Sequence, residues 1–192
     1  MSSEPLPAGF ETSRHLMESA ARLSLKNSIL ERLLCLFSGP LEPGRLYEDV
    51  LDIAMQAIPS EASSFFAAGA RGDLTIVAAR GSVSSKLHGL RLKKGQGLAG
   101  ACLGDRRLIA VSEVANDPRH AAAFARALGF ETRSLVAAPV LHDGRALGVV
   151  ELVNKVGSNE FQRHELELVE RITRTAGDLL ARAGETPKGK KR

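Results

Sequence analysis

The chain has 192 residues, of which 44% are hydrophobic and 25% charged, with a formal net charge of +4 at pH 7. This length and composition are typical of one globular domain with a packed core and exclude a wholly disordered chain. The last eight residues hold four cations and one carboxylate, so the rest of the chain is nearly neutral. Nucleic acid is therefore not expected as a partner, because its binding requires several phosphates to be neutralised.

The cysteines and the apolar runs indicate the compartment. Cys35 and Cys102 show no CxxC spacing, and no set of Cys and His has the spacing of metal ligands, so we predict free thiols and no metal. No apolar run approaches the roughly 20 residues of a membrane helix, and the N-terminus lacks the order of a signal peptide. We expect a cytoplasmic protein with no membrane contact, and its Arg-rich and Ala-rich composition is compatible with a bacterial source.

Residues 1–12 are expected to be disordered, and residues 13–38 to form an amphipathic helix. Apolar side chains at alternating spacings of four and three predict a coiled-coil seam in which Asn27 occupies an a position: Leu16, Ala20, Leu23, Asn27, Leu30, Leu34 and Phe37. A second apolar stripe widens this face: Leu25, Ile29, Leu33 and Leu36. Two interpretations stay open, one in which the helix contacts both a twin and its own domain, and one in which it docks only on its own domain.

The remaining elements follow from periodicity and from turn residues. After a Pro-rich and Gly-rich hinge at 38–45, helices are predicted at 45–58, near 97, at 119–128 and at 162–183. Strands are predicted at 62–68, 74–80, 87–93, 108–111, 134–141 and 146–154. The last two strands flank Asp143-Gly144, which is a strong hairpin signal. The fold class is thus α+β, with helices packed on an antiparallel sheet, followed by a basic, disordered tail at 184–192.

Residues 95–100 read GQGLAG and match the GxGxxG pattern of dinucleotide-binding loops. That function requires a parallel strand-helix-strand unit, and the next strand begins too soon for its crossover helix. We therefore interpret these glycines as a tight turn that leads into a short helix.

The motifs beyond residue 93 resemble those of the GAF domain family. They occur in the family's order at residues 95–100, 117–119, 129–134, 139–140 and 148–155, and the resemblance covers residues 45–183. It implies a six-stranded antiparallel sheet with helices packed on it, a small-molecule pocket, and dimers formed through terminal helices. The sequence leaves open whether the N-terminal or the C-terminal helix would form the dimer.

The resemblance also implies the residues that face the pocket. They are Ser64, Phe66, Asn116, Asp117, His120, Phe124, Thr132, Arg133 and Glu151. This mixture of acids, an Arg, a His and aromatic rings suits a polar heteroaromatic ligand. Alternatively, Asp117 caps the following helix, and Phe66 and Phe124 belong to the core.

Family members that bind cyclic nucleotides carry Asn-Lys, then Phe, three residues and Asp-Glu. Asn154, Lys155 and Phe161 match this motif, whereas Glu165 and Leu166 occupy its last two positions. We predict a structural role for these residues, with Lys155 and Glu165 forming an ion pair at the start of the last helix. The departure at Leu166 weakens the argument for a cyclic nucleotide.

The expected function is a non-enzymatic sensory module that binds a small molecule or a partner protein and signals in trans as a homodimer. A ligand-free interaction scaffold is the alternative. An enzyme similar to free-methionine sulfoxide reductases is less favoured, because alanines at 99 and 121–123 stand where such chemistry would need cysteines. No cofactor is expected, since a lone His is more often a surface residue than a haem ligand.

Overall fold

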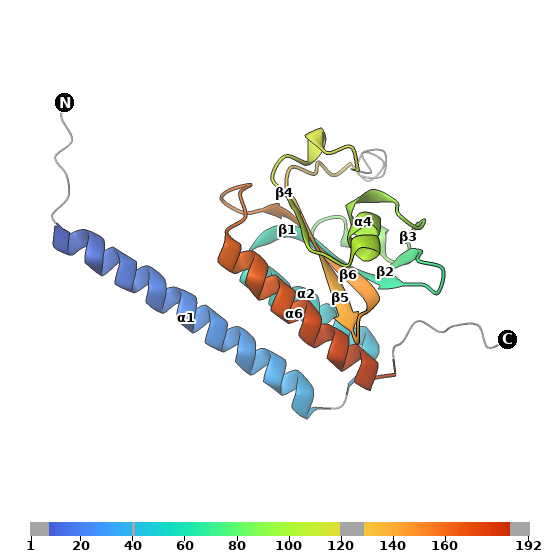
Figure 1. Ribbon diagram of the computed structural model, residues 1–192, viewed down its shortest axis with the longest axis horizontal. Coiled ribbons are helices and arrows are strands. Elements are labelled where there is room, and N and C mark those ends of the chain that lie inside the picture. The colour runs from blue at the N-terminus through green and yellow to red at the C-terminus, as the bar shows by residue number, and fades with distance from the viewer. Residues whose placement is uncertain (1–7, 40, 120–128, 185–192) are drawn as a thin grey trace.

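The computed structural model describes residues 8–39, 41–119 and 129–184 (Figure 1). Its centre is a six-stranded antiparallel sheet in the order β3-β2-β1-β6-β5-β4. The strands are β1 Ser60–Ala68, β2 Leu74–Arg80, β3 Arg91–Leu92, β4 Ile109–Val111, β5 Leu135–His142 and β6 Arg145–Lys155. The predicted fold class, an α+β sheet with packed helices and an N-terminal helix, is confirmed.

The central strands are buried on both faces because helices cover both sides of the sheet. Side chains alternate along β6, so Val150 and Leu152 join one hydrophobic cluster while Val149 and Val153 join the other. Asp143 and Gly144 adopt positive φ angles of 47° and 71° between β5 and β6. This is the conformation that the predicted tight hairpin turn requires.

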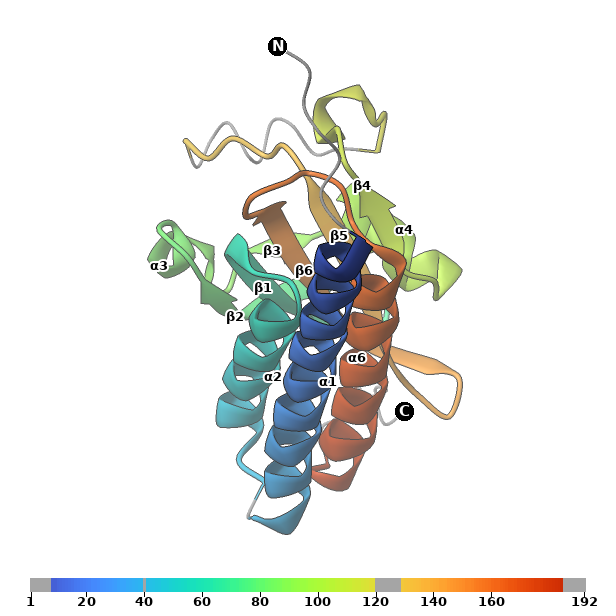
Figure 2. The same cartoon turned by 90° about the vertical axis from the view of Figure 1, so that its left-hand side faces the viewer.

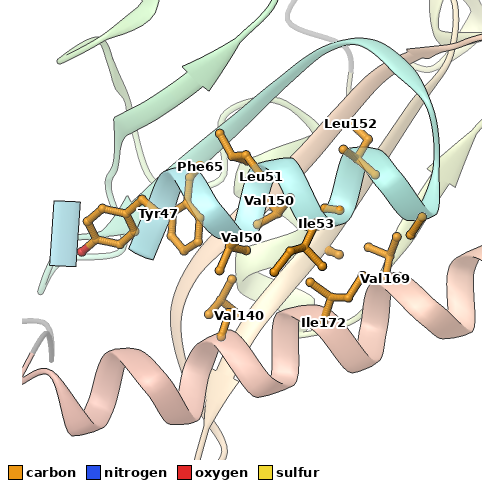
Figure 3. Close-up of a cluster of buried hydrophobic side chains, with 14 of the residues drawn as sticks. Tyr47, Val50, Leu51, Ile53, Phe65, Val140, Val150, Leu152, Val169 and Ile172 are labelled. Carbon is orange, nitrogen blue, oxygen red and sulfur yellow. The ribbon is translucent and has the colours of Figure 1, made fainter. Parts of the chain in front are cut away.

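The first face of the sheet is covered by α2 (Pro43–Ala57) and α6 (Arg163–Arg182). Their apolar sides close over β1, β5 and β6, where Phe65, Val140 and Val150 meet Val50 and Ile172 (Figure 3). The apolar side chains of α6 that could have formed a dimer seam are buried in this core instead: Val169, Ala176 and Leu180.

Helix α1 (Ala8–Ser38) forms an outer layer over α2 and α6 (Figure 2). Ile29 and Leu33 are buried against these helices. Gln56 of α2 accepts a hydrogen bond from Arg32 and donates one to Ser28, which fixes α1 on α2. The second stripe of the N-terminal helix is therefore a docking face for its own domain.

The heptad seam of α1 faces solvent. The exposed fractions of Leu16, Leu23, Leu30 and Leu34 lie between 53% and 66%. Phe37, which we expected in this seam, is instead half-buried against the core, with its ring 5.3 Å from the guanidinium of Arg182. The exposed stripe, here called the α1 seam, consists of Leu16, Ala20, Leu23, Asn27, Leu30 and Leu34.

The second face of the sheet carries α4 (Gly97–Asp105), α3 (Ser84–Leu87) and the short 3-10 helix η1 (Val114–Asn116). Leu98 and Cys102 of α4 and Leu87 of α3 pack on Phe66 and Ile76 of the sheet. Two hydrophobic clusters, one on each face, thus hold the sheet between two layers.

Two predictions about elements need correction. Helix α1 begins at Ala8, so residues 8–12, expected to be disordered, are helical. The strand predicted at 87–93 is only β3, because Leu87 ends a short helix and Gly89, with φ +80°, turns the chain. The predicted helix at 119–128 and the predicted tail at 184–192 fall almost entirely outside the described residues and stay predictions. None of the helices in the described part is long and apolar enough to cross a membrane.

Candidate functional site

Three of the residues predicted to face a ligand lie together on the second face of the sheet. Ser64 of β1 pairs with Glu151 of β6, and Phe66 pairs with Val149. Ser64 and Phe66 are buried, whereas Glu151 is partly exposed. We call Ser64, Phe66 and Glu151 the sheet-face site.

Glu151 also meets α4. The backbone N–H of Ala99, in the first turn of α4, donates a hydrogen bond to the Glu151 carboxylate. The residue before this helix, Gln96, makes no side-chain capping bond, so a distant strand supplies the acceptor that a helix N-terminus needs. Burial raises the pKa of Glu151 to about 7, although the bond from Ala99 acts in the opposite direction. Near neutral pH this carboxyl group can therefore accept or donate a hydrogen bond to a ligand.

Glu151→Gln should make the free energy of unfolding less dependent on pH. The folded protein holds the Glu151 proton up to about pH 7, whereas the unfolded chain releases it near pH 4.3. Wild-type stability should therefore fall as the pH rises between these values, and the variant should be more stable above pH 7 by about 2–3 kcal/mol. Urea unfolding at several pH values measures this difference. Glu170→Gln, at an exposed site on α6, is the matched control, and parallel profiles for wild type and Glu151→Gln would contradict the prediction.

The glycines of the GxGxxG pattern form a turn. Gly95 and Gly97 have φ angles of +74° and +71°, and a Cβ atom on Gly100 would lie 2.6 Å from the carbonyl carbon of Gly95. The strands of the sheet are antiparallel, so the parallel unit of a dinucleotide site is not formed here. The predicted turn into a short helix is confirmed.

Asn116 and Asp117, at η1 and the loop after it, form hydrogen bonds with their neighbours in the chain. Asn116 donates a hydrogen bond to Glu113 at 2.9 Å. The Asp117 carboxylate accepts bonds from the backbone N–H and the guanidinium of Arg119, the shortest at 2.6 Å. His120 and Phe124 lie outside the described residues, as does most of the helix that Asp117 was expected to cap.

Arg133 belongs to a polar cluster at the end of β6. Its guanidinium pairs with Glu61, and the Asn154 side-chain oxygen accepts its backbone N–H at 2.7 Å. Asn154 also donates to Glu61 at 2.8 Å, and the bonds from Asn154 and Arg133 lower the pKa of Glu61. Asn154 and Glu151 are three residues apart on one strand, a separation of about 10 Å. The structure therefore places Arg133 apart from the sheet-face site, with half-buried Thr132 beside it in the chain.

Asn154 links several segments of the chain through its side-chain hydrogen bonds. It is fully buried with a left-handed φ of +57°, and it donates to the Glu131 carbonyl as well as to Glu61. One amide thus joins β1, β6 and the segment before β5. Nothing local in the sequence identifies Glu61 as its partner, because the two residues are 93 positions apart.

Lys155 and Glu165 connect the sheet to α6. The Lys155 ammonium lies 2.7 Å from the Glu165 carboxylate, and their side chains are only 11% and 15% exposed. Glu165 also accepts the backbone N–H of Gln162, and Lys155 lies 5.9 Å from the centre of the Phe161 ring. This ion pair is therefore more enclosed than a surface pair.

A double-mutant cycle with Lys155→Met and Glu165→Gln should give a coupling energy of about 1–2 kcal/mol. The reason is that either single variant leaves a poorly solvated charge without its partner. Arg163 and Glu167 form an exposed pair on the same helix and provide the control, for which about 0.3–0.5 kcal/mol is expected. Chemical denaturation of the variants measures both coupling energies. Equal coupling energies in the two pairs would mean that the low exposure of Lys155 and Glu165 does not strengthen their ion pair.

The thiols do not form a reactive centre in the described residues. Cys102 is buried, its sulfur lies 3.4 Å from the Ala137 carbonyl oxygen, and burial raises its pKa. Cys35 is exposed on α1, remote in sequence from the sheet-face site. Across the part of the chain that the structure covers, His, Cys, Asp and Glu form no cluster suited to a metal ion.

This architecture, a six-stranded antiparallel sheet covered by helices on both faces, places the chain in the class of small α+β domains. The family model for the GAF domain matches residues 42–180, and the chain belongs to this family. Family members commonly serve in sensing and regulation. No curated protein matches the sequence.

Solved structures share the fold at low sequence identity. The GAF domain of a phosphoenolpyruvate-protein phosphotransferase from Coxiella burnetii is 21% identical, with a TM-score of 0.72, and the match covers 85% of this chain and 94% of that one. The corresponding domain from Acinetobacter is 14% identical, with a TM-score of 0.70 and coverages of 85% and 95%. The free methionine-R-sulfoxide reductase from Neisseria meningitidis, solved with its substrate, is 14% identical, with a TM-score of 0.67 and coverages of 86% and 93%.

Proposed function

We propose that this protein is a non-enzymatic sensory module that binds a small polar molecule at the sheet-face site and signals in trans as a homodimer. The observation that carries the proposal is the α1 seam, an apolar heptad stripe left exposed on a helix whose other stripe is docked on the domain. A change at the sheet can reach such a helix through α2 and α6, since both lie between α1 and the sheet (Figure 2).

Glu151 supports the ligand part of the proposal. It is a partly exposed carboxyl group with a pKa near 7, which is the kind of perturbed group that often marks a binding site. Ser64 adds a hydroxyl beside it, whereas Phe66 is packed in the hydrophobic core beneath α3 and α4, as its alternative interpretation predicted. A ligand with N–H or O–H donors would complement this surface.

Cyclic nucleotides should bind weakly, with no dissociation constant below about 10 μM, near −7 kcal/mol. A phosphate would need a free cation, whereas Arg133 is held by Glu61 and Arg119 by Asp117. Glu151 and Asp117 would also repel the anion. Isothermal titration with cAMP and cGMP measures this affinity, and a submicromolar constant that Arg133→Ala abolishes would refute the prediction.

The dimer part of the proposal rests on charge as well as apolar spacing. With Asn27 at an a position, exposed Lys26 takes a g position and exposed Glu31 takes an e position. In a parallel dimer the g residue of one helix faces the e residue five positions on in the other, so Lys26 meets Glu31 of the second copy as an opposite charge. The buried apolar face of α6 favours α1 as the dimer helix.

Native mass spectrometry of protein purified from its own cells tests the whole proposal. We expect the mass of a dimer with a bound small molecule, and loss of the small molecule but not of the dimer in Glu151→Leu. A dimer that never carries a small molecule would support the interaction scaffold instead. Thiol-dependent reduction of free methionine sulfoxide, lost in Cys102→Ser, would show that the protein is an enzyme.

A further inference from the structure

A groove that shares no lining residue with the sheet-face site runs along α4, from the residues before this helix to Arg106 after it. It is enclosed by the β1-β2 turn, the residues before α4, the outer side of α4 and the start of β6, and its volume is about 440 Å³. We propose that this groove, here called the basic groove, binds a small phosphate-bearing anion. The site goes beyond the proposed sensory function, because it uses none of the residues of the sheet-face site.

Three cations from three separate segments line the basic groove: Lys94 before α4, Arg106 after it, and Arg145 at the start of β6. All three are exposed, and the described lining contains no carboxylate to neutralise them. Arg106 donates a hydrogen bond to the Gly144 carbonyl at 2.9 Å, which holds its guanidinium next to Arg145 in the hairpin turn. Their charges therefore add at one place on the surface.

Three acids lie close in sequence to the lining residues, and none of them is itself part of the lining: Asp73, Asp105 and Asp143. The Asp73 carboxylate lies against Gly69 inside the β1-β2 turn, where a Cβ atom on that glycine would lie 2.4 Å from its oxygen. Asp105 is exposed at the end of α4, directly before Arg106. The Asp143 carboxylate lies 3.4 Å from the Nε2 atom of His142.

Gly104 lines the basic groove on the outer side of α4. It lies in α4, where glycine is a poor helix former, and a Cβ atom there would meet nothing within 4 Å. The other glycines of the loop have structural reasons, namely the positive φ of Gly95 and the contact of Gly100 with Gly95. The glycine at 104 leaves the backbone of α4 open to a ligand in the groove, but open space alone does not indicate a ligand, because the helical Gly44 is equally open.

The size and charge of the groove indicate the ligand class. Its volume lies within the range of roughly 300–1,000 Å³ that small-molecule sites have. Three positive charges match the two or three negative charges of a phosphate monoester or diphosphate, and guanidinium groups bind phosphate oxygens in a forked geometry. A compact phosphorylated molecule fits these conditions better than a long polyanion, because the cations converge on one groove.

Isothermal titration of the full chain with inorganic pyrophosphate, at about 0.15 M salt, tests the proposal. We expect a dissociation constant of about 10–100 μM, weakened about tenfold by Lys94→Gln or Arg145→Gln, because each variant removes one charge-assisted contact. Arg107→Gln removes the same charge one residue from Arg106 but lines a different groove, so binding should change less than about twofold. Gly104→Leu should abolish binding while the thermal midpoint stays equal or rises.

Three results would overturn the proposal. One is the absence of any heat of binding at millimolar pyrophosphate in the folded wild-type protein. Another is equal weakening by Arg107→Gln and Arg145→Gln, which would mean general attraction to a positive surface. The third is binding of heparin without binding of pyrophosphate, which would assign the groove to a macromolecular polyanion. If Gly104→Leu fails to fold, the Gln variants still decide the outcome.

Discussion

Gly177→Ala is expected to lower the free energy of unfolding by about 3 kcal/mol or more. Gly177 lies where α6 packs on β5, and a Cβ atom at this position would lie only 2.0 Å from the carbonyl oxygen of Leu141. A backbone atom in a sheet cannot move aside as a flexible side chain can, so the helix must shift away from the strand. The thermal midpoint should fall by roughly 6–12 °C for a domain of this size.

Gly44→Ala is the matched control for this prediction. Gly44 also lies in a helix, the first turn of α2, but a Cβ atom there would meet nothing within 4 Å. Because alanine is the better helix former, this variant should keep or gain up to about 1 kcal/mol of stability. Similar losses in both variants would mean that the close contact between Gly177 and Leu141 does not limit stability.

Leu23→Glu is expected to convert the protein from a dimer to a monomer, weakening self-association by at least about 100-fold, near 2.8 kcal/mol. Leu23 is 61% exposed at a d position of the α1 seam. In a parallel dimer the two residues face each other, so the variant removes apolar burial from both copies and places two carboxylates together. Light scattering over a concentration series measures the effect. Ala21→Glu carries the same charge on the same helical turn but outside the seam, and should leave the dimer intact.

Disulfide trapping tests the register of the same dimer. In a Cys35→Ser background, Asn27→Cys should form a cross-linked dimer readily, because only a parallel, in-register pair brings position 27 opposite itself. Ala21→Cys is exposed at a b position and should cross-link far more slowly. A wild-type protein that is monomeric at all accessible concentrations would refute the dimer, and would assign the seam to a helix from another protein.

Deleting the N-terminal helix as a unit is a poorer test of dimerisation. Ile29 and Leu33 of α1 are core residues of the domain, so removal of residues 1–37 would expose the apolar sides of α2 and α6. A deletion that ends at residue 24 removes only exposed side chains among residues 13–24 and leaves the docking stripe in place. This shorter chain should remain folded.

The sequence by itself determined most of the elements and the family, since both depend on local signals. Alternating apolar residues and the Asp-Gly turn predicted the β5-β6 hairpin, and the spacing of apolar residues revealed both stripes of α1. The family motifs along residues 95–166 implied the six-stranded sheet and singled out Asn154, Lys155 and Glu165. Such signals lie within a few residues of one another, and local backbone preferences are enough to produce them.

Only the tertiary structure decided which groups meet. It showed that the Ile29 and Leu33 stripe docks on the domain while the Leu23 stripe stays exposed, which the spacing alone left open. It also paired Glu151 with the N–H of Ala99 and brought Lys94, Arg106 and Arg145 to one groove. These residues are separated by 12 to 52 positions in the chain. Their proximity comes from the pairing of strands and the packing of helices on the sheet, which no local pattern encodes.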